Sequence, residues 1–195
     1  DVCSSDLLYI DHDSLVARAL FYLEATGAVS SSWTEAQLQM LTPTGYSILG
    51  ARTLDKIPDL VVDLKGPAGA LRIAVEVEAT RKSKARYGQI ALSYLGMKRV
   101  NLVLFICESG ELEREVRQAF TGSIFLQAGK TPITMLADSF TKRRLMAPAR
   151  VLDQTLELSE ILARALGEER MELDQGGMQN RTRIRNSSPF GEDAA

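Results

Sequence analysis

The stretch IPDLVVDLKGPAGALRIAVEVEATRKSKARYGQI, residues 57–90, decides the fold and contains the strongest functional motif of this chain. Pro58-Asp59 stands directly before a short apolar run, residues 60–64. A turn with two glycines, residues 65–69, leads to a second extended run, residues 71–79. Two strand-like runs joined by a short glycine-containing turn predict a β-hairpin.

The second strand of this hairpin carries a pair of acidic residues. Side chains two positions apart lie on the same face of a strand, roughly 6.5–7 Å from each other. Glu76 and Glu78 therefore share one face, while the apolar side chains at positions 71, 73, 75 and 77 occupy the other. Because Asp59 opens the neighbouring strand, we expect the hairpin to bring it close to the two glutamates.

Converging carboxylates point to a cation, because they repel one another unless a positive charge compensates them. Hard oxygen donors of this kind suit Mg²⁺ or Mn²⁺, so we predict a metal site formed by Asp59, Glu76 and Glu78. Such a metal would polarise a phosphoryl oxygen and activate a water molecule. Lys82 or Lys84, which follow the strand, would stabilise the developing negative charge.

The order of Pro58-Asp59, hairpin, acidic strand and lysine resembles the PD-(D/E)XK nuclease superfamily. Within it, residues 76–87, EVEATRKSKARY, followed by Tyr94, are similar to the replication-relaxation family of plasmid replication and mobilisation proteins. The resemblance implies a restriction-endonuclease-like fold and a Mg²⁺-dependent endonuclease or nickase that acts on DNA. It assigns Asp59 and Glu76 as metal ligands, with the Val77 carbonyl as a further ligand.

The chain departs from the superfamily pattern at Glu78, where that pattern expects lysine. In one interpretation, Glu78 is the second acidic ligand and Lys82 or Lys84 supplies the missing cation, with Glu24 of the first helix as a further carboxylate. In the other, the chain is a catalytically inactive nuclease-fold module that binds DNA in replication initiation or mobilisation. The sequence leaves both open.

The predicted DNA contacts are Arg81, Lys84 and Arg86. The net charge of the chain is −2, so attraction for phosphate has to come from a local basic cluster. Cations at a helix start oppose the helix dipole, a conflict that a bound phosphate would relieve. We therefore expect DNA as the main partner, with other replication or mobilisation proteins as further partners, and leave the oligomeric state open.

Outside the hairpin, the sequence predicts an α/β domain with a mixed sheet of about four to five strands and helices on both faces. Predicted helices cover residues 11–26, 34–38, 84–95, 111–120 and 151–169. Predicted strands cover residues 60–64, 71–79, 100–107, 123–127 and 133–136, with a weaker first strand within residues 38–48.

We assign residues 11–140 to the nuclease-like domain, 141–170 to a C-terminal helical extension and 171–195 to a disordered tail. The amphipathic helix at 151–169 leaves a protein-interaction domain as a third interpretation. Residues 1–10 are set apart, because a first residue other than Met and the composition of residues 1–7 suggest non-native sequence and a missing upstream domain.

Composition describes an ordinary globular protein, with 45% hydrophobic and 25% charged residues. No apolar run approaches the roughly 20 residues that span a bilayer. Cys3 and Cys107 give neither a disulfide framework nor a zinc set, so we expect a cytoplasmic protein. His12, the single histidine, is expected at a helix start or on the surface. Tyr87 and Tyr94 are expected in the core rather than in base stacking.

Overall fold

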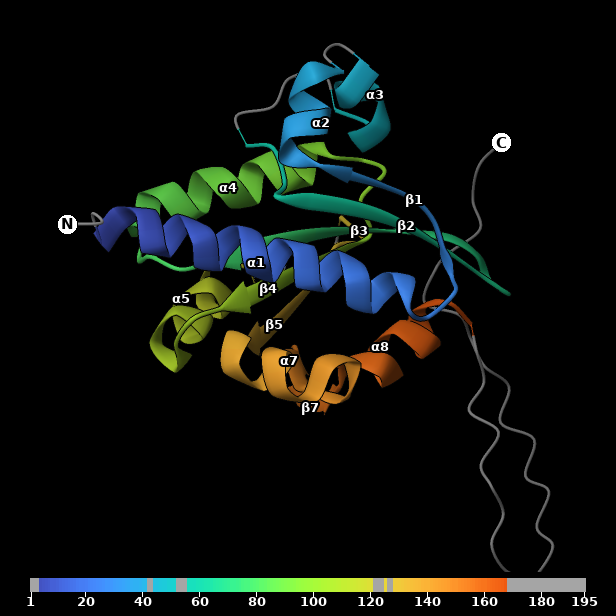
Figure 1. Cartoon of the computed structure of the whole chain (residues 1–195). Helices are drawn as coiled ribbons and strands as arrows, with labels where there is room; N and C mark the ends of the chain where they lie inside the picture. The colour runs from blue at the N-terminus through green and yellow to red at the C-terminus, as the bar shows by residue number, and fades with distance from the viewer. Residues whose placement is uncertain (1–3, 42–43, 52–55, 121–124, 126–127, 168–195) are drawn as a thin grey trace, which may run out of the picture.

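The computed structural model describes residues 4–41, 44–51, 56–120, 125 and 128–167. The described strands form one seven-stranded mixed sheet in which strand order follows the chain (Figure 1). Strands β1 to β3 run antiparallel, β3 to β5 run parallel, and β6 and β7 return antiparallel. Their bounds are β1 Val29–Thr34, β2 Leu60–Gly66, β3 Gly69–Glu78, β4 Leu102–Cys107, β5 Thr131–Leu136, β6 Pro148–Val151 and β7 Gln154–Glu157.

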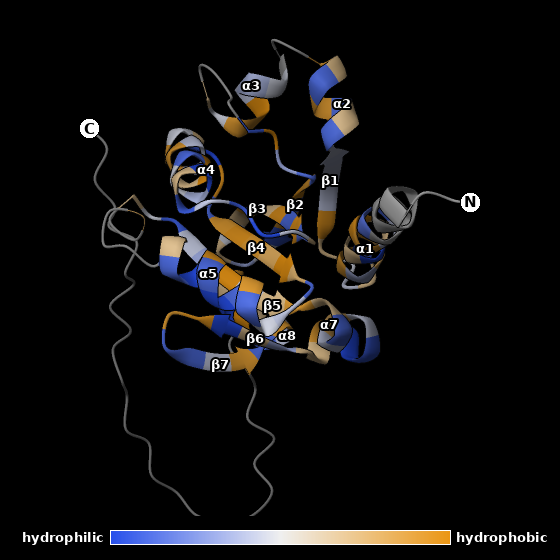
Figure 2. Ribbon diagram, turned by 90° about the vertical axis from the view of Figure 1, so that its left-hand side faces the viewer, coloured by the Kyte–Doolittle hydropathy of each residue, from blue (hydrophilic) through white to orange (hydrophobic). Residues whose placement is uncertain are grey.

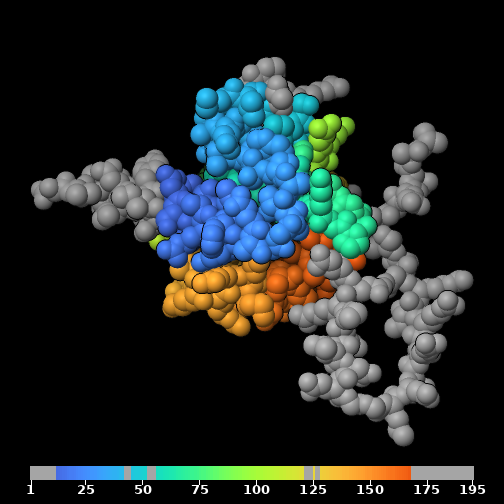
Figure 3. Space-filling model, turned by 45° about the vertical axis from the view of Figure 1, so that its right-hand side comes forward, coloured from blue at the N-terminus to red at the C-terminus, as the bar shows by residue number. Residues whose placement is uncertain are grey.

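Helices cover both faces of the sheet and bury a separate apolar cluster on each (Figure 2). One face is covered by α1 (Ser4–Glu24), α7 (Ala137–Arg143) and α8 (Leu158–Ala165), with the short 3₁₀ helix η1 (Arg144–Met146) between the last two. The other is covered by α2 (Glu35–Met40), α3 (Thr44–Leu49), α4 (Lys84–Gly96) and α5 (Gly110–Phe120). In Figure 3 the blue surface of α1 lies between the lighter blue region of α2 and the orange segment of α7.

The predicted hairpin is confirmed. Gly66 pairs with Gly69 across a tight turn, and Leu60 pairs with Val75 at the other end. Gly69 has a φ of 115°, a conformation that side-chain-bearing residues rarely adopt, so the turn depends on this glycine. The predicted alternation along β3 is also confirmed, because Ile73, Val75 and Val77 join the core under α1.

The α/β class is confirmed, but the sheet has more strands than the four to five predicted. The two extra strands, β6 and β7, come from a hairpin where helix 151–169 was expected to begin. Leu152 has a φ of 54°, which a helix does not allow, and the chain turns there. The residues assigned to a helical extension, 141–170, therefore contribute two strands to the sheet, and helix forms only from Leu158.

The weak first strand predicted within residues 38–48 is wrong, because the described part of that segment lies in α2 and α3. The first strand is instead β1, whose sequence VSSSWT lacks a clear apolar alternation. Thr34 ends it by capping α2 in a reciprocal arrangement with Gln37. Most of the strand predicted at 123–127, the whole tail 171–195 and residues 1–3 lie outside the described residues.

None of the described helices is both long enough and apolar enough to cross a membrane.

Candidate functional site

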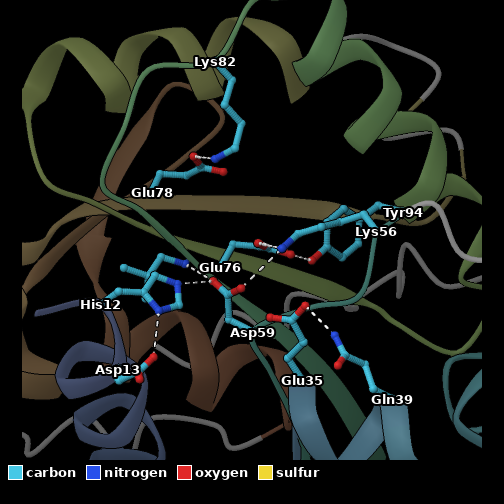
Figure 4. Close-up of polar contacts among 11 residues, drawn as sticks. His12, Asp13, Glu35, Gln39, Lys56, Asp59, Glu76, Glu78, Lys82 and Tyr94 are labelled. Atoms are coloured by element: carbon cyan, nitrogen blue, oxygen red, sulfur yellow. Dashed lines mark hydrogen bonds and ion pairs between the residues drawn. The ribbon is translucent and has the colours of Figure 1, made fainter. Parts of the chain in front are cut away.

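Asp59 lies directly before β2, and its carboxylate extends the hydrogen bonding between the two strands of the hairpin by one contact. The backbone ladder between β2 and β3 ends at Leu60 and Val75, so the Val77 N–H lies beyond the last paired residues. The Val77 N–H instead donates to Asp59 Oδ2 at 2.7 Å. The predicted proximity of Asp59 to the acidic strand is therefore confirmed, and its carboxylate has a structural role there (Figure 4).

Lys56 is the site residue that sequence reasoning missed. Its Nζ lies 3.3 Å from Asp59 Oδ1 and 2.9 Å from Glu76 Oε2, so one ammonium group joins the two carboxylates. The Lys56 side chain is 19% exposed, and those of Asp59 and Glu76 are 6% and 2% exposed. Lys56 precedes Pro58-Asp59 in an irregular segment without periodicity, so the one available signal was its position three residues before Asp59.

His12 also binds this cluster, which corrects the expectation of a helix-start or surface role. The ring lies within α1 and is 28% exposed. Nε2 lies 3.2 Å from Asp59 Oδ2, and Nδ1 lies 3.2 Å from Asp13 Oδ1. Because both nitrogens face a carboxylate, the arrangement suits the doubly protonated imidazolium.

Glu24, the further carboxylate considered above, lies away from this cluster. It is exposed at the last residue of α1, twelve residues beyond His12. At a rise of 1.5 Å per residue, that distance is about 18 Å along the helix.

Tyr94 closes the other side of the cluster. It is fully buried beside Phe105 and Phe120, as expected for a core residue, and its hydroxyl donates to Glu76 Oε1. The carboxylate of Glu76 is thereby held between Tyr94 and Lys56 (Figure 4). We call His12, Lys56, Asp59, Glu76 and Tyr94 the acidic-pair cluster.

Glu78 belongs to a second, separate pair. It shares the face of Glu76, as predicted, but its carboxylate binds the Lys82 ammonium and is 1% exposed. The Lys82 Nζ also lies over the ring of Tyr87, 5.9 Å from the ring centroid. The structure thus brings Asp59 and Glu76 together around Lys56, while the predicted third ligand is paired with a lysine of its own.

The pKa values of the acidic-pair cluster follow from burial and from these contacts. Burial acts against the charge of Asp59, but His12, Lys56 and the Val77 N–H together hold its pKa below the ordinary value. The hydrogen bond to Asp59 is the main cause that raises the pKa of His12 from 6.5 to about 9. Burial, followed by repulsion from Asp59, raises the pKa of Glu76 from 4.5 to about 8, although Lys56 and Tyr94 act in the opposite direction.

The described residues do not fit a Mg²⁺ or Mn²⁺ ion as they stand. Both oxygens of Asp59 and both oxygens of Glu76 already accept hydrogen bonds or ion pairs from protein groups. With His12 protonated, His12 and Lys56 compensate Asp59 and also Glu76 when it is ionised, so charge compensation needs no added ion. Within the described ranges, no three acidic, histidine or cysteine side chains are grouped closely enough to hold a metal.

The predicted DNA contacts lie at the start of α4, next to the Glu78–Lys82 pair. Lys84 and Arg86 are exposed in the first turn of this helix. Arg81 precedes it and binds Glu115 at 2.5 Å and Glu111 at 3.5 Å, both on α5. A pocket of about 420 Å³ opens here between the two helices, and it is lined by Arg81, Lys82, Ser83, Lys84, Tyr87, Glu115, Gln118 and Ala119.

A second pocket, of about 390 Å³, reaches the acidic-pair cluster from the opposite face of the sheet. It lies between α1 and the start of α2, and His12 and Asp59 line it together with Glu35. Glu35 receives a hydrogen bond from Gln39, and its own N–H donates to the Asp59 carbonyl. Solvent therefore reaches the cluster through His12, while Glu76 stays enclosed.

Comparison of the chain with protein-family models, with curated proteins and with solved structures finds no match. The function therefore has to be inferred from the chemistry of the site.

Proposed function

We propose that this chain is a nuclease-fold module that binds nucleic acid and does not cleave it with a metal ion. The observation that carries the proposal is Lys56, whose ammonium lies 3.3 Å from Asp59 and 2.9 Å from Glu76. A lysine at this place supplies the charge that a metal would otherwise supply, and it uses the oxygens that a metal would need. The acidic pair is then a stabilising part of the core.

The order and direction of the elements support the nuclease-like part of the proposal. Apart from the short helices α2 and α3 between β1 and β2, the chain runs through helix α1, the antiparallel strands β1 to β3, helix α4 and the parallel strand β4. This is the helix, three strands, helix, strand order that the PD-(D/E)XK resemblance implies. The acidic residues lie where that resemblance expects them, before the second strand and at the end of the third. A role in plasmid replication or mobilisation belongs to the same proposal.

The basic start of α4 supports the nucleic-acid part. Lys84 and Arg86 are exposed at the end of the helix where the backbone carries a partial positive charge. Cations placed there lower helix stability, and a phosphate group would remove that cost. Lys84, Arg86 and the neighbouring Arg81 are therefore the proposed contacts with the nucleic-acid backbone.

Charge reversal at the start of α4 is expected to weaken DNA binding at least about tenfold at moderate salt, because each lost phosphate contact also lowers counterion release. The test variant is Lys84→Glu with Arg86→Glu. Fluorescence anisotropy with a labelled duplex and a labelled single strand measures affinity at several salt concentrations. Affinity is expected to be the same with Mg²⁺ and with EDTA.

A matched control separates local contact from net charge. Lys65→Glu with Lys98→Glu makes the same change in charge at two exposed residues near the opposite end of β3 and β4. Equal loss of affinity in both double variants would count against a binding site on α4. Absence of DNA affinity in the native protein would overturn the proposal.

The second candidate function is a Mg²⁺-dependent endonuclease. It is favoured by one observation, namely that aspartate, glutamate and lysine come together at the strand ends, although the lysine is Lys56 rather than the expected residue. Incubation of supercoiled plasmid with the protein and Mg²⁺ or Mn²⁺ tests it, with Glu76→Gln as the control. Cleavage that Glu76→Gln abolishes would replace the first function by this one, whereas intact plasmid supports the first.

A further inference from the structure

We propose that the pocket between α4 and α5 binds a phosphate monoester, namely the terminal phosphate of a nucleic-acid strand. This inference rests on the proposed nucleic-acid binding and names the chemical group that the start of α4 recognises. The pocket has a volume of about 420 Å³, within the usual range for small-ligand sites and sufficient for a terminal nucleotide.

Tyr87 is the first sign of a ligand. Among the described residues, its hydroxyl is the one buried side-chain polar group without a well-formed hydrogen bond: the Lys82 N–H lies near its oxygen, but no acceptor binds its proton. The side chain is 2% exposed, yet the residue lines the pocket. A buried hydroxyl without a partner costs free energy, and a phosphate oxygen in the pocket would provide the missing acceptor.

The first turn of α4 is the second sign. This helix has 13 residues, and Ser83 caps it by accepting a hydrogen bond from the Arg86 N–H. The Tyr87 N–H donates to the Ser83 carbonyl, which leaves the N–H groups of Lys84 and Ala85 without an intrahelical acceptor. Free N–H groups at the positive end of a helix form an anion site, and Ser83 and Lys84 line the pocket itself.

The charges around the pocket favour an anion. Arg81, Lys82 and Lys84 line it, and they face two carboxylates, Glu115 in the lining and Glu78, which is bound to Lys82. Arg81 pairs with Glu115 at 2.5 Å, so the carboxylate is already compensated. A monoester carries nearly two negative charges at neutral pH, whereas an internal phosphodiester carries one. The recessed position of Tyr87 between the helices also suits a strand end better than a continuous backbone.

Oligonucleotides of one sequence test the inference, prepared with a 5′-phosphate, with a 3′-phosphate or with hydroxyl groups at both ends. The native protein is expected to bind one phosphorylated form at least about tenfold more tightly than the unphosphorylated form. Competition by inorganic phosphate and by a nucleoside monophosphate shows whether the pocket recognises the phosphate alone or a whole terminal nucleotide.

Two single substitutions have opposite expected effects. Tyr87→Phe removes the hydroxyl and keeps the ring. The affinity for the phosphorylated strand should then exceed that for the unphosphorylated strand by less than about threefold. Glu115→Gln breaks the ion pair with Arg81 and removes a negative charge that repels phosphate, so binding of the phosphorylated end should become tighter. Tyr46→Phe, a partly exposed tyrosine of α3 outside the pocket, is the control and should change neither.

The outcomes separate this inference from the function on which it rests. Equal affinity for phosphorylated and unphosphorylated strands overturns the phosphate pocket and leaves nucleic-acid binding in place. If no strand binds, the proposed function fails, and binding of the nucleoside monophosphate then decides the pocket independently. A Tyr87→Phe variant that keeps the full preference also overturns the inference.

Discussion

Lys56→Met is expected to lower the free energy of unfolding by about 3–5 kcal/mol above pH 8, where Glu76 is ionised, because it removes the cation that two buried carboxylates share. Methionine keeps most of the length and volume of lysine, so loss of packing contributes little. Asp59 and Glu76 are 6% and 2% exposed, and water can therefore compensate them only poorly. Urea unfolding followed by circular dichroism measures the change.

Lys65→Met provides the control, since Lys65 is exposed on the hairpin and its loss should cost less than about 0.5 kcal/mol. A second substitution sharpens the test. Asp59 keeps its contacts with His12 and the Val77 N–H, so adding Glu76→Gln to Lys56→Met removes the carboxylate that has lost its cation, and most of the lost stability should return. A Lys56→Met variant as stable as the native protein would show that the acidic pair does not depend on this ammonium.

Stability is also expected to fall as the pH rises from about 6.5 to 9, by roughly 2–3 kcal/mol on account of His12. The pKa of His12 is raised in the folded protein, so protonation favours folding. This contribution is fully present below the unfolded value of 6.5 and is lost as the pH rises through about 9. Glu76 adds a loss in the same direction between 4.5 and about 8, because its pKa is raised by burial.

Asp59 has the opposite dependence. Its pKa is lowered in the folded protein, so its contribution is present above the ordinary value of 3.8 and is lost as the pH falls below it. Stability should therefore be greatest in mildly acidic solution and should decline on both sides.

His12 is the single histidine of the chain, so its titration can be followed without assignment. Proton NMR of the imidazole C–H should give a pKa near 9, and thermal unfolding at several pH values should show the matching loss of stability. His12→Asn should remove the part of the decline that lies between about pH 6.5 and 9 and keep the part due to Glu76. An imidazole that titrates near 6.5 would contradict the contact between His12 and Asp59.

The hairpin and the face of each β3 side chain could be predicted because they depend on residues close together in the chain. Alternation of apolar and acidic residues places Glu76 and Glu78 on one face whatever packs against it. The start of α4 could be predicted for the same reason, since Ser83 caps the helix through a hydrogen bond to a residue three positions away. A nearly continuous apolar run also predicted β4, and β5 was predicted as a further short strand.

Secondary structure was mispredicted where one spacing of apolar residues fits both a helix and a β-hairpin. Leu152, Leu156 and Leu158 fit a helical spacing, yet the turn at Leu152 places the first two in a hairpin. Strand β1 was missed because its polar sequence has weak alternation, and its pairing with β2 depends on residues about thirty positions further along the chain.

The sequence by itself determined that Asp59, Glu76 and Glu78 stand near one end of a β-hairpin, because strand geometry repeats every two residues. The tertiary structure alone decided which charges meet them. His12 reaches Asp59 across 47 residues through the packing of α1 on the sheet, and Tyr94 reaches Glu76 through the packing of α4. Lys56 lies in an irregular segment, so neither helical nor strand periodicity predicts its position. The acidic strand could therefore be predicted, but its compensation by lysine and histidine could not, because those partners are selected by long-range packing.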